Sequence, residues 1–269
     1  MSMTIATLGD GTQVYCLKVA EAKVLDSHIE GYMKHGIQVK PGDTVFDVGA
    51  NIGMFGVRMA QRCDGDLRII AFEPIPTIRA CTELNLEPWE GAQVLPYGIA
   101  RARGETTFTF YPNAPSLSTA HLTDWDGQAG ALEEAVVGNA QSAPMWYAKF
   151  VPRILAGPIA RWLTHAPIEV QCELRTLSEM IIELKVDQID LLKIDCEGAE
   201  EEALLGLTED HWKAVDQVVV EVHDIDGRLA RIEALLLQHG LTEIVTEKEE
   251  ALVHTKLSNV YAHRPRYQG

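Results

Sequence analysis

The feature that most constrains the fold of this chain is the stretch Asp43–Phe55, which reads D-T-V-F-D-V-G-A-N-I-G-M-F. A short run of β-branched and aromatic residues leads directly into a glycine-containing turn, and apolar residues at helical spacing follow. A buried strand, a glycine turn and a helix in this order form the opening unit of doubly wound α/β sheets that bind nucleotides. The stretch therefore predicts an α/β fold with a ligand at the turn.

Four residues in the turn, Asp47, Gly49, Asn51 and Gly53, limit the kind of ligand. Gly49 would let the backbone come close to the ligand, and Gly53 would let the start of the helix pack tightly on the strand. Asn51 stands where a dinucleotide fingerprint has its middle glycine, and asparagine tolerates a left-handed backbone better than most residues. The G-x-G-x-x-G of NAD enzymes is therefore missing. A tight turn in some other α/β protein is the alternative.

Further apolar runs predict the rest of the sheet. Each is short, rich in β-branched residues and bounded by turn residues, as buried strands are. The last two runs suit an antiparallel pair. After the opening strand, the predicted strands are Arg68–Phe72, Gln93–Leu95, Ile189–Ile194, Val218–Val222, Leu241–Thr246 and Asn259–His263.

The chain divides into three parts. Residues 1–38 predict an amino-terminal cap, made of a hairpin around an Asp-Gly turn and a helix that ends at Gly36. Residues 39–111 and 168–269 carry the strands and helices of the main domain. Residues 112–167 interrupt that rhythm with a stretch rich in proline, alanine and tryptophan, which predicts an inserted lid. An ordinary helical excursion packed on the core is the alternative.

An acidic residue, Glu73, directly follows the second strand in the segment F-E-P. Doubly wound folds place an acidic side chain at this strand end, where it accepts hydrogen bonds from a ribose diol. Together with the glycine turn, Glu73 therefore predicts a site for an adenosine-containing cofactor. The alternative is a surface glutamate that caps the next helix.

Four segments in this order resemble the FkbM family of S-adenosylmethionine (SAM)-dependent methyltransferases: V-F-D-V-G-A-N-I-G, F-E-P, L-L-K-I-D-C-E-G-A-E and V-V-E-V-H. The most specific part is Lys193–Glu200, and the resemblance extends from about Val39 to about Ala262. It implies a Rossmann-like class I methyltransferase fold with a seven-stranded, mostly parallel sheet, helices on both faces and an antiparallel last strand. It also implies SAM as the cofactor and methyl transfer, usually to a hydroxyl of a polyketide, peptide or sugar natural product.

On this interpretation, some side chains at the strand ends bind the cofactor and others take part in the reaction. A hydroxyl acceptor is about as weak an acid as water, with a pKa of roughly 15.7, so it needs a base or a metal. His223, oriented by Glu197 or Glu221, is the predicted base, with Asp195 beside it. The predicted cofactor residues are Asp47, Gly49, Asn51, Gly53, Glu73 and Asp195.

A metal is the alternative to the base. Asp195, Glu221 and Asp224 could hold Mg²⁺, which prefers hard oxygen ligands. Of these two mechanisms, the metal-free general base is preferred. The consecutive glutamates Glu200–Glu202 are expected to form a solvated first helical turn, where acidic residues suit the helix dipole.

The charge balance limits the partners. Lys and Arg number 23 against 39 Asp and Glu, for a formal net charge of −16. A chain this acidic is expected to repel nucleic acid and anionic membranes. No apolar run reaches membrane-spanning length, and the first ten residues lack the features of a signal peptide. The five cysteines are odd in number and lack C-x-x-C spacing, which predicts reduced thiols in a cytoplasmic protein.

The predicted partner is a small-molecule acceptor, either free or tethered to a carrier protein. Other functions stay open. The same fold could serve an N- or carboxyl-methyltransferase, or a non-catalytic SAM-fold module that binds a partner through residues 112–167. An NAD oxidoreductase is disfavoured because the middle glycine of its fingerprint is missing.

Overall fold

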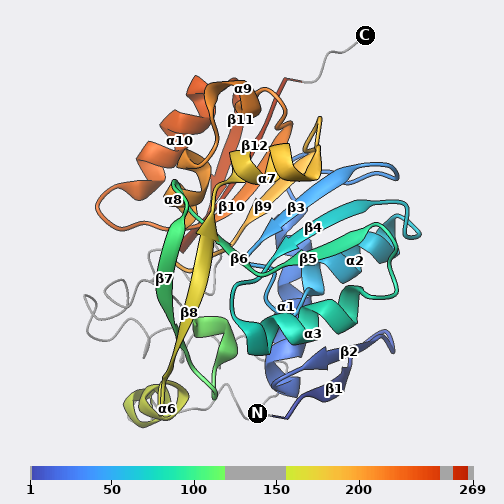
Figure 1. The fold of residues 1–269 in the computed structure, drawn as a ribbon, viewed down its shortest axis with the longest axis vertical. Coiled ribbons are helices and arrows are strands. Elements are labelled where there is room, and N and C mark those ends of the chain that lie inside the picture. Colours follow the sequence, from blue (N-terminus) through green and yellow to red (C-terminus); the bar gives the residue numbers. More distant parts are fainter. Residues whose placement is uncertain (1, 119–155, 249–256, 266–269) are drawn as a thin grey trace.

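At the centre of the fold is a sheet of seven strands in the order β11-β12-β10-β9-β3-β4-β5 (Figure 1). The computed structural model describes residues 2–118, 156–248 and 257–265. Strand β12 runs antiparallel to both of its neighbours, and the other strand pairs of this sheet are parallel. This arrangement confirms the predicted Rossmann-like α/β fold. The strands are β3 (Thr44–Val48), β4 (Arg68–Phe72), β5 (Ala92–Leu95), β9 (Leu191–Ile194), β10 (Gln217–His223), β11 (Glu243–Glu247) and β12 (Leu257–His263).

Helices cover both faces of this sheet, because alternate side chains of each strand point to opposite faces. Phe46 and Val48 pack with one group of helices, whereas Val45 packs with the other. The face of Phe46 is covered by α7 (Leu177–Leu184), α8 (Glu200–Leu205), α9 (Glu209–Trp212) and α10 (Arg228–Gln238). The face of Val45 is covered by α1 (Val19–Tyr32), α2 (Met54–Arg62) and α3 (Pro76–Leu86).

The amino-terminal residues form the predicted hairpin and helix. Strands β1 (Thr4–Thr7) and β2 (Gln13–Cys16) pair antiparallel, and α1 follows them onto the sheet. Arg58 of α2 connects these elements through ion pairs of 2.6 Å to both Asp10 and Asp26. The hairpin and α1 are thus attached to the sheet face that α2 covers.

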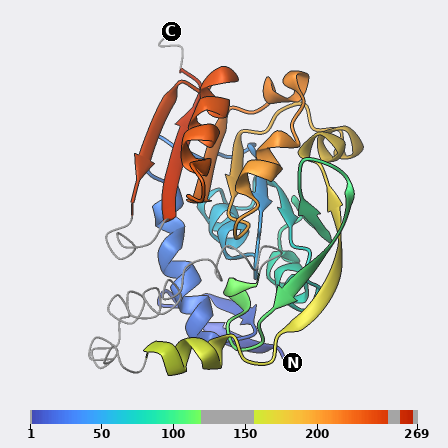
Figure 2. The same cartoon turned by 90° about the vertical axis from the view of Figure 1, so that its left-hand side faces the viewer.

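A second sheet of three strands has the order β6-β8-β7. It contains β6 (Tyr97–Ile99), β7 (Gly104–Phe110) and β8 (Ile168–Arg175). Strands β7 and β8 pair along their length and form a ribbon that ends near α6 (Ala156–Leu163) (Figure 2). The sequence also predicts a strand or hairpin arm at Gly104–Tyr111 and a strand at Ile168–Leu174, close to the bounds of β7 and β8. It does not predict their pairing, because residues 112–167 separate them.

Of the predicted insertion, only the two ends are described. They contain a 3-10 turn at Pro115–Leu117 and the helix α6. Trp125 and Trp146 lie outside the described residues, as does most of the segment for which the lid is predicted.

Two strands begin two residues later than predicted. Strand β9 begins at Leu191, because Ile189 makes only an isolated bridge to Val215. Strand β11 begins at Glu243, because Leu241 is buried in the turn that follows α10.

Two further expectations concern membranes and thiols. Within the described ranges, no helix combines the length and the apolar character needed to cross a membrane. All five cysteines are free thiols, and four of them are buried, as predicted.

Candidate active site

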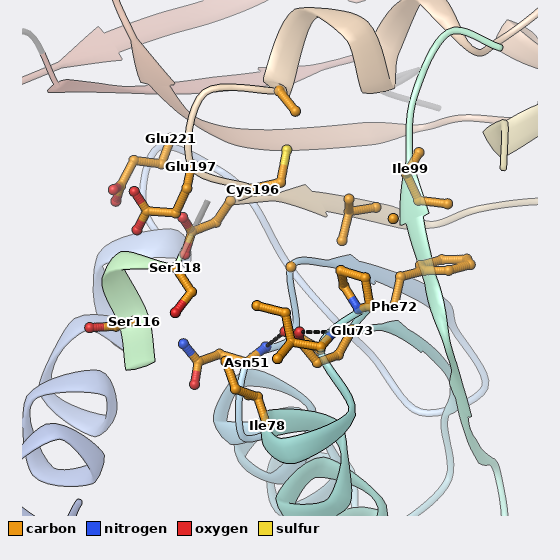
Figure 3. Close-up of a pocket in the computed structure, with 18 of the residues that line it drawn as sticks. Asn51, Phe72, Glu73, Ile78, Ile99, Ser116, Ser118, Cys196, Glu197 and Glu221 are labelled. Atoms are coloured by element: carbon orange, nitrogen blue, oxygen red, sulfur yellow. Dashed lines mark hydrogen bonds between the residues drawn. The ribbon is translucent and has the colours of Figure 1, made fainter. Parts of the chain in front are cut away.

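A cavity of about 450 Å³ opens at the carboxyl ends of strands β3, β4, β9 and β10. Doubly wound sheets bind their ligands at such strand ends. Helix α1 and strands β6 and β7 supply further walls. Of the predicted site residues, Asp47, Gly53 and Asp224 do not line the cavity. Those that line it are Gly49, Asn51, Glu73, Asp195, Glu197, Glu221 and His223. Figure 3 shows Asn51, Glu73, Glu197 and Glu221 among the lining residues.

The turn after β3 has the backbone that its sequence predicts. Gly49 and Asn51 have φ angles of +76° and +50°, in the left-handed region that few non-glycine residues adopt. A Cβ atom on Gly49 would lie 1.8 Å from the backbone oxygen of Asp195. Glycine is therefore required here because two strand ends approach each other, and this approach also shapes the cavity wall.

Gly53 packs against a different neighbour from the one expected. Its φ is +80°, and a Cβ atom there would lie 3.0 Å from the side chain of Thr82 in α3. The glycine thus allows α2 to pack closely on α3 and not on the strand, because the turn directs the start of α2 toward the adjacent helix. Gly53 itself does not line the cavity.

Asp47 lies behind the turn, in a buried ion pair with Lys193. The Lys193 ammonium is 3.0 Å from Oδ1 of Asp47 and donates to the carbonyl oxygen of Gly49 at 3.0 Å. Asp47 is fully buried, so it anchors the turn from behind and does not reach the cavity. Burial lowers the pKa of Lys193, but the charges of Asp47 and Asp195 outweigh burial and raise it, so this lysine stays charged.

Glu73 lies at the end of β4, as predicted, and is buried. Its carboxylate accepts hydrogen bonds from the backbone N–H groups of Asn51, at 3.1 Å, and Ile75, at 2.9 Å (Figure 3). A carboxylate has about four acceptor positions, so capacity remains for a ligand diol in the cavity. Burial raises the pKa of Glu73 to about 7, although the two backbone hydrogen bonds oppose the shift.

His223, at the end of β10, lies between two carboxylates. Its Nδ1 is 2.9 Å from Oε1 of Glu200, and its Nε2 is 3.4 Å from Oε2 of Glu197. Burial alone would lower the pKa of His223, but the hydrogen bonds and charges of both glutamates raise it well above its usual value. The ring is therefore held as an imidazolium, with each nitrogen facing a carboxylate.

Glu200 departs most from the expectation. The sequence predicts a solvated helical turn, but this side chain is fully buried. It accepts hydrogen bonds from the backbone N–H of Gly198, at 2.7 Å, and from Arg228 of α10, at 3.2 Å. Burial is possible because these donors and His223 together satisfy the carboxylate. Glu200 therefore orients His223 at Nδ1, a role that the sequence predicts for Glu197 or Glu221.

Glu197 and Glu221 come from neighbouring strand ends and point into the same side of the cavity (Figure 3). Glu197 has a φ of +50°, a left-handed backbone that is uncommon outside glycine. Such backbone strain often accompanies functional sites. The two glutamates form an acidic wall next to His223.

The alternative metal ligands are not brought together. Asp195 and Glu221 line the cavity, whereas Asp224 accepts a hydrogen bond from the backbone N–H of Leu229 at 3.2 Å. Asp224 therefore serves the first turn of α10. Among the residues that the structure describes, no three His, Cys, Asp or Glu side chains are grouped so that they could hold a metal ion.

Four residues of this site are not predicted from sequence: Tyr32, Lys193, Glu200 and Arg228. Tyr32 of α1 donates its hydroxyl hydrogen bond to Asp195 at 2.9 Å, so the amino-terminal helix reaches the site. Only Lys193 carries a local signal, since a lysine within the apolar strand L-L-K-I needs a buried partner. The other three depend on contacts between distant segments.

The residues around the cavity fit SAM in three respects. The left-handed turn at Gly49 and Asn51 lets backbone border the cavity without a side chain in between. Glu73 offers acceptor capacity for a ribose diol. Asp195 offers a carboxylate for an ammonium group.

Comparison with known proteins agrees with this fit. The Methyltransferase FkbM domain matches residues 47–241. The chain is 34% identical to the 31-O-demethyl-FK506 methyltransferase FkbM of Streptomyces tacrolimicus, over 98% of this chain and 99% of that protein. It is 30% identical to Methyltransferase 1 of Beauveria bassiana, over 96% of each. At 34% identity, 97% of this chain also aligns with 12% of the AMB antimetabolite synthetase AmbE of Pseudomonas aeruginosa. The chain therefore belongs to the FkbM methyltransferase family and is a SAM-dependent methyltransferase.

Proposed function

We propose that this methyltransferase methylates a hydroxyl group of a small-molecule natural product of the polyketide, peptide or sugar type. The observation that carries the proposal is the pairing of Glu197 with His223 in the same cavity as the residues that fit SAM. The name of the relative from Streptomyces tacrolimicus, a 31-O-demethyl-FK506 methyltransferase, supports an oxygen acceptor.

Three parts of the chain would hold the cofactor. Glu73 would accept from the ribose hydroxyls, Asp195 would bind the ammonium group, and the Gly49 turn would border the cofactor with backbone. When bound, SAM supplies an electrophilic methyl group on a sulfonium. Holding the acceptor in the same cavity contributes several kcal/mol, since oriented pairs reach effective molarities of about 10⁵ M or more.

The base must be a side chain that can accept the proton of the acceptor hydroxyl. Full deprotonation of an alcohol at neutral pH would cost roughly 12 kcal/mol, so a base must take the proton as the methyl group is transferred. The sequence predicts His223 for this role, but an imidazolium has no lone pair to accept a proton. We therefore assign the proton to the carboxylate of Glu197, with His223 orienting it and Glu200 holding His223 in place.

The test is to incubate the enzyme with SAM and a panel of natural-product alcohols, each paired with the analogue that carries an amine at the same position. Mass spectrometry and NMR of the products locate the new methyl group, which we expect on oxygen. Methylation of the amines or of carboxyl groups alone would establish the alternative acceptor class. Intact SAM binding without turnover on any acceptor would favour a non-catalytic SAM-binding module.

A tethered acceptor is tested in the same assay. The chain aligns with a short part of a much longer antimetabolite synthetase. This alignment supports offering each acceptor that has a carboxyl group in two forms, as the free acid and as the carrier-protein thioester. A higher kcat/KM for the thioester would assign the tethered form as the substrate.

Removing Glu73 tests the cofactor assignment. We expect Glu73→Ala to weaken SAM binding by about 1.5–3 kcal/mol, because a charged acceptor is lost. In the parent, SAM affinity should fall as the pH drops below about 7, because Glu73 then becomes protonated and accepts fewer hydrogen bonds. Glu73→Ala should lack this part of the pH dependence. Isothermal titration calorimetry on either side of that pH measures both effects.

The matched control is Glu83→Ala, since Glu83 lies on α3 and pairs with Arg79 at the surface. Its SAM affinity should equal that of the parent. If Glu73→Ala bound SAM as tightly as the parent, the ribose assignment would be wrong.

Chelation tests the metal-free mechanism. We expect turnover to survive EDTA, because Asp224 serves the first turn of α10 and the proton has an acceptor in Glu197. Loss of activity in EDTA, restored by Mg²⁺, would move the catalytic role to Asp195 and Glu221 as metal ligands.

A further inference from the structure

We propose that Tyr32, at the end of the amino-terminal helix α1, is a positioning residue that orients Asp195 toward the ammonium group of SAM. The proposal rests on the use of SAM and not on the identity of the methyl acceptor. It gives helix α1 a place in cofactor binding, although the FkbM domain match begins only at Asp47.

The hydrogen bond itself is well defined. The Tyr32 hydroxyl donates to Oδ2 of Asp195 at 2.9 Å, and Tyr32 is only 7% exposed. Burial, followed by the charges of Asp195 and Glu221, raises the pKa of the Tyr32 phenol well above its usual value. The phenol therefore stays protonated and acts as the hydrogen-bond donor to Asp195.

Packing fixes the phenol relative to the sheet. The ring of Tyr32 lies edge-on to Phe55 of α2, with centroids 5.9 Å apart, and the Lys193 ammonium is 5.5 Å from its centroid. The end of α1 is also tied to strand β12, where the Tyr261 hydroxyl donates to the Gly31 carbonyl at 2.7 Å. Tyr32 is thus a rigid donor and not a mobile surface residue.

The contacts of Asp195 are one-sided. Among the described residues, both Tyr32 and Lys193 contact Oδ2, the lysine at 3.6 Å. Tyr32, at 2.9 Å, is therefore the nearer partner of Asp195. Lys193 lies closer to Asp47, at 3.0 Å, than to Asp195. These contacts leave Oδ1 for a cationic group in the cavity that Asp195 lines. The amino-acid end of SAM carries such a group.

The experiment compares three ligands by isothermal titration calorimetry. SAM and S-adenosylhomocysteine carry the ammonium group, whereas 5′-methylthioadenosine keeps the adenosine and lacks the amino acid. We expect Tyr32→Phe to weaken binding of the first two about tenfold and to leave methylthioadenosine unchanged. Unchanged methylthioadenosine binding also shows that the variant is folded, since phenylalanine keeps the ring that packs on Phe55.

A double-mutant cycle with Asp195→Asn identifies the pathway of the effect. If Tyr32 acts through Asp195, the double variant should bind SAM no more weakly than Asp195→Asn alone. Tyr15→Phe is the matched control, because Tyr15 lies on β2 and is 37% exposed, and it should bind all three ligands like the parent.

Three results would overturn the inference: equal SAM affinity in Tyr32→Phe and the parent, additive effects in the cycle, or equal weakening of all three ligands. None of these results would bear on the proposed methyl acceptor, because the measurements do not involve an acceptor. A parent that binds none of the three ligands would instead refute the cofactor assignment, and this inference with it.

Discussion

Replacing Glu197 by glutamine should lower kcat by about 10²–10⁴-fold, the usual contribution of a general base, while the affinity for SAM changes little. Glutamine keeps the size of the side chain and an oxygen that can face His223, but it cannot accept the proton of the acceptor hydroxyl. In the parent, kcat should rise with pH as the carboxyl group of Glu197 loses its proton, because burial raises the pKa of Glu197 above its usual value. Steady-state kinetics with saturating SAM, over a range of pH, measures both quantities.

Glu201→Gln is the matched control for this experiment. Glu201 lies on α8, close in sequence to Glu197, but pairs with Arg231 at 2.7 Å outside the cavity. Its turnover should equal that of the parent. If Glu197→Gln kept parental turnover and His223→Asn did not, the base would be His223, as the sequence alone predicts.

Lys193→Met should lower the free energy of unfolding by about 3–5 kcal/mol. The ammonium of Lys193 and the carboxylate of Asp47 have side-chain exposures of 4% and 0%, so solvent cannot replace the missing partner. Loss of the lysine leaves Asp47 as a buried, uncompensated charge and also removes the donor to the Gly49 carbonyl. Urea unfolding followed by circular dichroism gives the change.

Two companion variants separate the ion pair from a general effect of losing a lysine. Lys213→Met removes an exposed lysine, 77% accessible and paired with Asp210, and should leave stability unchanged. The double variant Asp47→Leu/Lys193→Met should be more stable than Lys193→Met, because no unpaired buried charge remains. If Lys193→Met unfolded at the same urea concentration as the parent, the turn would not depend on this pair.

Short-range patterns account for most of the fold. The apolar runs are predictable as strands because a strand buried on both faces is nearly continuously apolar. The backbone at Gly49 and Asn51 is predictable because chirality restricts left-handed φ angles to few residue types. The place of Glu73 follows from the same logic, since a parallel sheet gathers its strand ends at one edge.

Longer-range patterns are less visible. Strands β7 and β8 were each predictable from their composition, but their pairing crosses residues 112–167 and leaves no local trace. Gly53 is likewise predictable as a turn residue, but its packing partner is not. Its packing partner Thr82 depends on the angle between two helices.

The sequence by itself determined which polar residues stand at the strand ends, because the apolar runs and the turn residues that bound them are local features of the chain. Only the tertiary structure decided which partners these residues contact. Glu200 is a buried partner of His223 and not a solvated residue, because Arg228, 28 positions away, satisfies its charge. Asp195 meets Tyr32 from 163 positions away. The free energy of a charged side chain depends on whether burial is offset by such partners, and the fold alone brings them within hydrogen-bonding distance.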